Sequence, residues 1–142
     1  MYKKILVALE NSRADQSLLP HVTQLAKLLG SHLLLVHVAD GWAARNIAHL
    51  QLRPSEEMRL DRDYIERVAA GLTAEGFDAE AVLATGDPAR EITAAASRER
   101  CDLIAMGTHG HRFIGDVIHG SVASAVRHQT SVPVLLVRAP SE

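Results

Sequence analysis

Short apolar runs alternate with helix-like segments along this chain, and that alternation restricts the fold more than any other feature. Apolar runs at residues 5–9, 33–38, 103–106 and 132–137, of which the second contains His37, predict strands buried on both faces of a sheet. Residues 77–84 alternate apolar and polar positions, which predicts a strand nearer the sheet edge. The chain therefore reads as five strands separated by helices.

The first helix follows the first strand, with apolar residues at three- and four-residue steps from Leu18 to Leu29. Gly30 is a typical helix stop. Pro20 lies within the pattern, so the helix either begins near Ser17 or is kinked at the proline.

The remaining helices are marked by their caps. Ser55 is predicted to cap a long helix that ends near Gly76, and residues 40–54 before it show no periodicity. Asp87 is predicted to cap a helix that runs to about Arg100, with proline as its first residue. A last helix is expected to start at the glycine-rich segment before residue 122.

Strands that alternate with helices predict an α/β fold. We expect one domain over residues 1–142, a Rossmann-like open five-stranded parallel sheet with two helices on each face. Ligands of such sheets bind beyond the carboxyl ends of the strands. The loop at residues 10–12 and the glycine segment would face one another if strands 1 and 4 are neighbours, which the sequence alone leaves open.

Composition narrows the class of partner. The net charge is −2 and the pI is about 6.4, which argues against a nucleic-acid partner bound by a basic face. No apolar run is long enough for membrane insertion, and the N-terminal run lacks the features of a signal peptide. The single cysteine allows no intrachain disulfide, which fits a cytoplasmic protein.

The segment 107–121 carries the strongest functional signal. Its three glycines are Gly107, Gly110 and Gly120, and Ser121 follows the last one directly. A strand-like run precedes the segment and a helix-like run follows it. Glycines let backbone amides approach a ligand, and a helix N-terminus attracts an anion. The segment therefore predicts a nucleotide or phosphate site, although the first two glycines could instead serve a tight turn and Ser121 could be only an N-cap.

Over essentially its whole length the chain resembles the universal stress protein family. The resemblance rests on K-K-I-L-V-A-L, L-L-L-V-H-V, G-D-P-A-R-E-I, D-L-I-A-M-G-T-H-G and the ending G-S-V-A-S-A-V-R…S-V-P-V-L-L-V-R. The glycine segment fits the family signature G-x2-G-x9-G-[S/T], which is typical of the members that bind ATP. The resemblance implies a sheet order of 3-2-1-4-5, with strands 1 and 4 side by side.

The resemblance also implies an ATP site. Mg²⁺ would neutralise the phosphates if the protein hydrolyses ATP. Adenine would meet backbone groups at the end of strand 2, and ribose and phosphates would meet the glycine segment. The implied nucleotide-binding residues are Ala8, Leu9, Glu10, Val38, Met106, Gly107, Thr108, His109, Gly110, Gly120, Ser121, Val122 and Ala123. Family members commonly carry Asp-Gly-Ser after strand 1, where this chain has Glu10-Asn11-Ser12.

The segment is not a Walker A loop. Such a loop needs a lysine, and this chain has none after Lys27. Arg112 and Arg127 are the nearest cations, and each could be a solvated surface charge. We therefore expect no catalytic residues and no fast phosphoryl transfer. Slow ATP hydrolysis or autophosphorylation, and a nucleotide-free module that docks onto a protein partner, remain the alternatives.

Other side chains have both a functional and a structural interpretation. His109, His111 and His119 could hold a metal, but too few further ligands accompany them, and no metal site is expected. His37 is expected to be a hydrogen-bonded core histidine, and Cys101 an inert packing residue.

An exposed Trp42 in the irregular segment could anchor a partner protein or cover the core, and the sequence does not separate these roles.

The fifth strand, residues 132–137, is apolar and would lie at a sheet edge, which is an aggregation hazard if uncovered. The resemblance implies a homodimer that pairs these strands. The leading hypothesis is a cytoplasmic, dimeric, ATP-binding stress-response protein in which nucleotide occupancy regulates an unknown protein partner.

Overall fold

The computed structural model describes residues 1–40, 54–108 and 116–140, with only the backbone course for residues 40, 54–55 and 116–121. The element order is β1 (Lys4–Ala8), α1 (Ala14–Leu29), β2 (His32–Asp40), α3 (Pro54–Ala74), β3 (Ala79–Gly86), α4 (Pro88–Arg98), β4 (Leu103–Thr108), α5 (Asp116–Gln129) and β5 (Val134–Arg138). The predicted alternation of strands and helices is confirmed.

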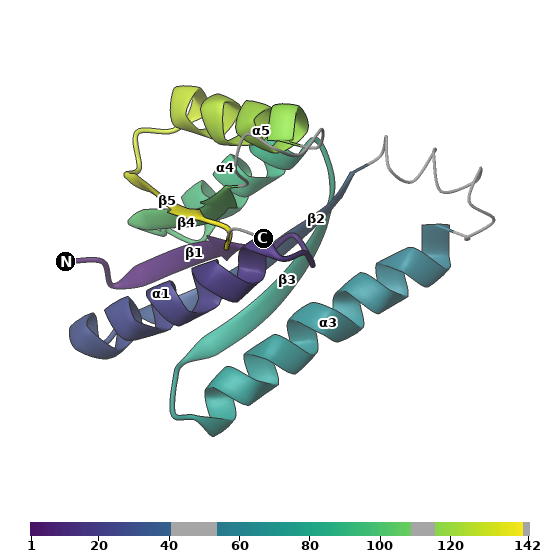
Figure 1. The fold of residues 1–142 in the computed structure, drawn as a ribbon. Helices are drawn as coiled ribbons and strands as arrows, with labels where there is room; N and C mark the ends of the chain where they lie inside the picture. Colours follow the sequence, from purple (N-terminus) through teal and green to yellow (C-terminus); the bar gives the residue numbers. More distant parts are fainter. Residues whose placement is uncertain (41–53, 109–115, 141–142) are drawn as a thin grey trace.

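All five strands form one parallel sheet of order β3-β2-β1-β4-β5. β1 therefore lies at the centre, with β2 on one side and β4 on the other, as the resemblance implied (Figure 1). The chain order reverses at β1, so the gap between β1 and β4 is the topological switch point where ligands of such sheets bind.

Of the helices that the structure describes, α1 and α3 cover one face of the sheet, and α4 and α5 cover the other. Every second residue of β1, such as Ile5 and Val7, packs with α1 and α3, and the intervening Leu6 and Ala8 pack with α4 and α5. This alternation follows from the two-residue period of a strand. Both faces are apolar, which explains why β1 and β4 appear in the sequence as continuous hydrophobic runs.

The structure decides three expectations about where helices start. α1 begins at Ala14, so Pro20 lies inside it rather than near its start. Ser55 is the second residue of α3 and therefore not its N-cap. Asp87 is confirmed as the cap of α4, because its carboxylate accepts from the Arg90 N–H at 3.0 Å.

β3 runs two residues further than predicted, to Gly86. β5 begins at Val134, two residues later than predicted. β5 lies at an edge of the sheet, as expected, and Leu136 is 40% exposed there.

Candidate functional site at the carboxyl end of β1

The carboxyl ends of β2 and β4 extend past the end of β1. The last β1 partners are Val36 on β2 and Met106 on β4, both aligned with Ala8. Leu9 donates its N–H to the Val36 carbonyl at 2.8 Å. Because peptide groups alternate in direction along a strand, those of Val38 also face the β1 side, beyond the point where β1 has ended.

Gly107 faces the same space from β4. On the same strand, Ile104 and Thr108 direct peptide groups to β5, through the bonds Ile104 N–H to Pro133 O and Ala139 N–H to Thr108 O. By the same alternation Gly107 directs its peptide groups toward β1. Backbone groups of β2 and β4 therefore border the space that lies beyond the end of β1.

The loop between β1 and α1 is fixed by a buried carboxylate. Asp15, in the first turn of α1, is 2% exposed. Its two oxygens accept from the N–H groups of Glu10 and Asn11, at 3.0 and 2.9 Å. Asn11 adopts a left-handed backbone with φ +60°, a conformation that asparagine tolerates better than most residues. Asparagine can therefore occupy the place where the family resemblance implies glycine.

Ser12 orients the side chain of Glu10. Its hydroxyl donates to the Glu10 carboxylate at 2.8 Å and accepts from the Ala14 N–H at 3.3 Å. The Glu10 carboxylate is thus held at the carboxyl end of β1 by its own loop.

A chain of polar contacts ties this loop to α3 and β2. Tyr64 donates its phenol hydrogen to Asp15 at 2.6 Å, and the Asn11 side chain donates to Asp61 at 3.2 Å. Asp61 also lies 3.1 Å from the Nε2 of His37, whose Nδ1 is 2.8 Å from the Leu9 carbonyl. Burial and the Asp15 carboxylate both raise the pKa of Tyr64, so its phenol remains a donor.

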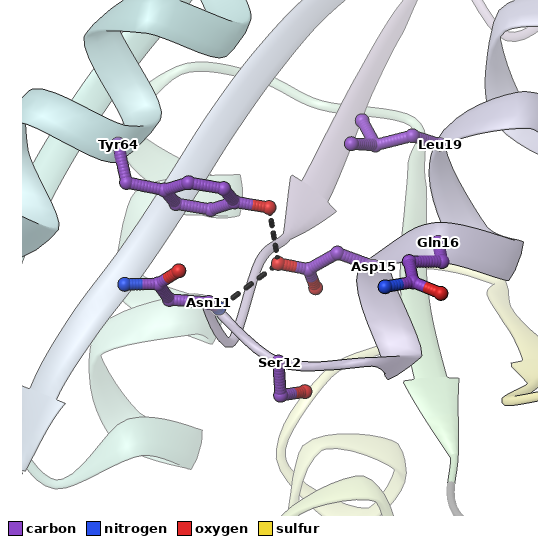
Figure 2. Close-up of a pocket in the computed structure, with 6 residues that line it drawn as sticks. All are labelled: Asn11, Ser12, Asp15, Gln16, Leu19 and Tyr64. Atoms are coloured by element: carbon purple, nitrogen blue, oxygen red, sulfur yellow. Dashed lines mark hydrogen bonds between the residues drawn. The ribbon is translucent and has the colours of Figure 1, made fainter.

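A pocket of about 330 Å³ opens between α1 and α3 beside this loop (Figure 2). Asn11, Ser12, Asp15, Gln16, Leu19 and Tyr64 line it. None of these six belongs to the predicted nucleotide-binding set. The pocket lies on the α1 and α3 side of the sheet, whereas Ala8, Met106 and Val38 pack on the α4 and α5 side.

The structure brings most of the described candidate residues together at one end of the sheet. Ala8, Leu9 and Met106 are less than 9% exposed, so only their backbone groups are available to a ligand. Val38 and Thr108 are half-buried at the strand ends. His109 and Gly110 lie outside the described residues, as do Arg112 and Trp42.

The last helix starts within the glycine segment, as expected, but earlier than Ser121. α5 begins at Asp116, so Gly120 and Ser121 are its fifth and sixth residues. Ser121 is therefore not an N-cap, and the unpaired N–H groups of the first turn belong to earlier residues. Val122 and Ala123 pack onto the α4 and α5 side of the sheet.

Gly107 also has a structural role, which is one of the two interpretations that the sequence left open. A Cβ at this position would lie 2.8 Å from the Ala14 Cβ and 3.3 Å from the Ala14 carbonyl oxygen. The absence of a side chain therefore allows α1 to start close against β4.

The expectations for His37 and Cys101 are confirmed. Both ring nitrogens of His37 have partners, and burial raises the pKa of the Cys101 thiol to about 11. Among the described residues no group of three or more His, Cys, Asp or Glu could hold a metal ion. Of the predicted histidine ligands, His109 and His111 lie outside the description, as does the side chain of His119.

Sequence reasoning missed the buried carboxylates Asp15 and Asp61. The helical spacing could have identified both, because it places each of them on the apolar face of its helix. Asp15 lies three residues before Leu18 and seven before Val22, on the apolar face of α1, and Asp61 lies four before Ile65. A carboxylate on the buried face of a helix must be hydrogen-bonded.

Comparison with known proteins places the chain in a family. The sequence profile of the universal stress protein family matches residues 1–138. A universal stress protein of Thermus aquaticus is 32% identical over 139 residues, which cover 97% of this chain and all of the relative. One of Methanocaldococcus jannaschii is 28% identical over 155 residues, which cover 97% of this chain and 96% of the relative.

The solved structure of the same Methanocaldococcus protein superposes with a TM-score of 0.81 at 27% identity, over 100% of this chain and 99% of the other. A universal stress protein of Archaeoglobus fulgidus, solved in complex with dAMP, has the same fold, with a TM-score of 0.70 at 21% identity over 96% and 98% of the two chains. Within the described ranges no helix is long and apolar enough to cross a membrane. The chain belongs to the universal stress protein family.

Proposed function

We propose that this protein binds ATP at the carboxyl end of β1 and acts as a nucleotide-dependent regulatory protein of the stress response. The observation that carries the proposal is the pair of backbone segments, at Val38 and Gly107, that border the space beyond β1. The intact glycine signature and the dAMP complex of the Archaeoglobus relative support an adenine nucleotide as the ligand.

The residues at this end of the sheet fit such a ligand. An adenine ring can be recognised by one backbone donor and one backbone acceptor, and the peptide groups at Val38 offer both. Glu10, held by Ser12, supplies a carboxylate on the adenosine side. The remaining contacts, to ribose and phosphates, belong to Gly107, Thr108, His109, Gly110, Gly120, Ser121, Val122 and Ala123 in this proposal.

Binding rather than fast chemistry is the proposed role. The chain has no lysine after Lys27 to reach the terminal phosphates, and we assign no catalytic residue. Mg²⁺, when bound with ATP, would neutralise phosphate charge.

We also propose that the protein is a one-domain cytoplasmic homodimer. The exposed edge of β5, with Leu136 40% exposed, supports pairing of two copies through this strand. The single cysteine, buried and protonated, fits a reducing compartment. Nucleotide occupancy would then change the surface that a protein partner recognises.

Titration calorimetry with ATP tests the proposal. We expect saturable binding to the wild type and its loss in Gly120→Val, because the branched side chain would occupy the space in which the proposed phosphate contact forms. Gly71→Val is the matched control, since Gly71 is also a helical glycine and has no atoms within 4 Å of an added Cβ. No ATP binding by the wild type at millimolar concentration, or equal loss in both variants, would contradict the proposal.

A further inference from the structure

Asp15 is the most deeply buried charged residue of the described chain, at 2% exposure. It does not line the space beyond β1, yet both of its oxygens point back to the loop that carries Glu10. The side chain reaches out of its own helix to residues that precede it by four and five positions. Its hydrogen bonds therefore fix the loop rather than the helix.

The backbone of this loop requires stabilising hydrogen bonds. Asn11 has a left-handed backbone at φ +60°, which costs energy for any residue other than glycine. Two charge-assisted bonds to consecutive N–H groups can hold that conformation, because bonds to a buried carboxylate are stronger than neutral ones. Tyr64 in turn fixes Asp15 from α3, with its hydroxyl 2.6 Å from Oδ2 (Figure 2).

The Asn11 side chain extends the same arrangement. It donates to Asp61, which contacts His37 of β2. The loop is thus held from three elements, namely α1 through Asp15, α3 through Tyr64 and Asp61, and β2 through His37. A glycine at position 11 could take the same backbone but could not make the contact with Asp61.

We propose that Asp15 is a positioning residue for nucleotide binding, which holds the backbone of Glu10 and Asn11 so that the Glu10 carboxylate is presented at the end of β1. The functional half of this inference rests on the proposed ATP site. The structural half, that Asp15 holds the backbone of Glu10 and Asn11, concerns the ligand-free protein and does not depend on ATP binding.

Amide hydrogen exchange in the ligand-free protein tests the structural half. In Asp15→Asn we expect the N–H groups of Glu10 and Asn11 to exchange at least about tenfold faster, because a charge-assisted partner is lost. Asp102→Asn is the matched control. Asp102 accepts from the N–H groups of Lys3 and Lys4 at the opposite end of β1, so only those amides should change.

Tyr64→Phe offers a milder variant if Asp15→Asn fails to fold. It removes one bond to Asp15 and leaves both backbone bonds in place, so exchange at residues 10 and 11 should rise by a smaller factor. Unchanged exchange at these two amides in Asp15→Asn, or in Tyr64→Phe where only that variant folds, would overturn the proposal.

ATP affinity tests the functional half through a double-mutant cycle. We expect Asp15→Asn to weaken ATP binding about tenfold and Asp102→Asn to change it less than twofold. On a Glu10→Gln background, Asp15→Asn should have little further effect, because Asp15 acts through Glu10. A full additive loss would show a general structural role and overturn the proposal.

The two proposals fail in different ways. If the wild type binds no ATP, the proposed function fails, and the exchange rates still decide whether Asp15 holds the loop. If ATP binds and the cycle is additive, only the positioning role fails.

Discussion

The two ends of β1 use the same device under different conditions. At the carboxyl end, Asp15 accepts from the consecutive N–H groups of Glu10 and Asn11, at 3.0 and 2.9 Å. At the amino end, Asp102 accepts from those of Lys3 and Lys4, at 2.9 and 3.1 Å. At each end of the central strand, one carboxylate thus accepts hydrogen bonds from two consecutive backbone N–H groups.

The difference lies in burial and in the additional partners. Asp15 is 2% exposed and receives a third bond from Tyr64, whereas Asp102 is only half-buried. Water can replace the lost bonds more readily at the amino end, where the carboxylate itself is accessible, than around the buried Asp15. At the amino end of β1, Asp102 therefore binds the backbone from an accessible position. At the carboxyl end, the buried Asp15 holds the loop of the proposed binding site.

The largest effect is expected at Asp15. Asp15→Ala leaves two backbone N–H groups and a phenol without their buried acceptor, so the free energy of unfolding should fall by about 3–5 kcal/mol. Urea unfolding followed by circular dichroism measures it. Asp102→Ala should cost only about 1 kcal/mol. Equal losses in the free energy of unfolding for the two variants would contradict the difference between the two ends.

Close packing at the carboxyl end gives the next prediction. Gly107→Ala places a Cβ 2.8 Å from that of Ala14 and should destabilise the fold by about 1–3 kcal/mol. Ala14→Gly in the same chain should restore part of the loss. As a control, Gly71→Ala meets no atom within 4 Å and should stabilise α3 by about 0.5–1 kcal/mol. Gly107→Ala at wild-type stability would rule out the contact.

Tyr64→Phe probes the third partner of Asp15 alone. We expect a loss of about 1.5 kcal/mol in the free energy of unfolding, since one bond to a charged acceptor disappears. Burial and Asp15 raise the pKa of Tyr64, so its phenol should ionise at higher pH than a solvated tyrosine.

Absorbance of the phenolate during alkaline titration measures this second effect. Tyr2 is the only other tyrosine of the chain, and Tyr64→Phe should remove the late transition. A late transition that survives in the variant would show that Tyr64 is not its source.

The smallest effect is the pH dependence at the amino end. Burial by itself would raise the pKa of Asp102, but the N–H groups of Lys3 and Lys4 outweigh it and lower that pKa below 3.8. The stabilisation is therefore complete above the unfolded value near 3.8 and is lost as pH falls through the folded pKa. Unfolding of the wild type and Asp102→Asn between pH 2 and 7 should show the difference shrink with acid. A difference independent of pH would contradict the assignment.

Much of the fold could be predicted from sequence because both faces of the sheet are buried. Continuous apolar runs and helical spacing follow directly from that burial. The start of α4 could be predicted from Asp87 and Pro88 alone, because the cap and the first helical residue are adjacent in the sequence. The sheet order came only with the family resemblance, since strand adjacency depends on contacts far apart in the chain. The sequence leaves the start of α1 open, because a proline in the first two turns is compatible with a helix that starts near Ser17 and with one that runs through Pro20.

The candidate site was predictable only in part. Val38 and Gly107 lie near the carboxyl ends of β2 and β4, so their place at this edge could be predicted from the two apolar runs. The support beneath Glu10 could not, because Asp15, Asp61 and Tyr64 come from two helices whose relative position the sequence does not state. Gly107 illustrates a further limit, since one residue type serves both packing against Ala14 and access for a ligand.

The contrast between the two ends leads to one decisive measurement, which is backbone amide NMR of the protein during titration with ATP. We expect saturable shifts at Glu10, Val38, Gly107 and Thr108, and none at Lys3, Lys4 and Asp102. Shifts centred on the amino end of β1, or no shifts with ATP at millimolar concentration, would contradict this expectation.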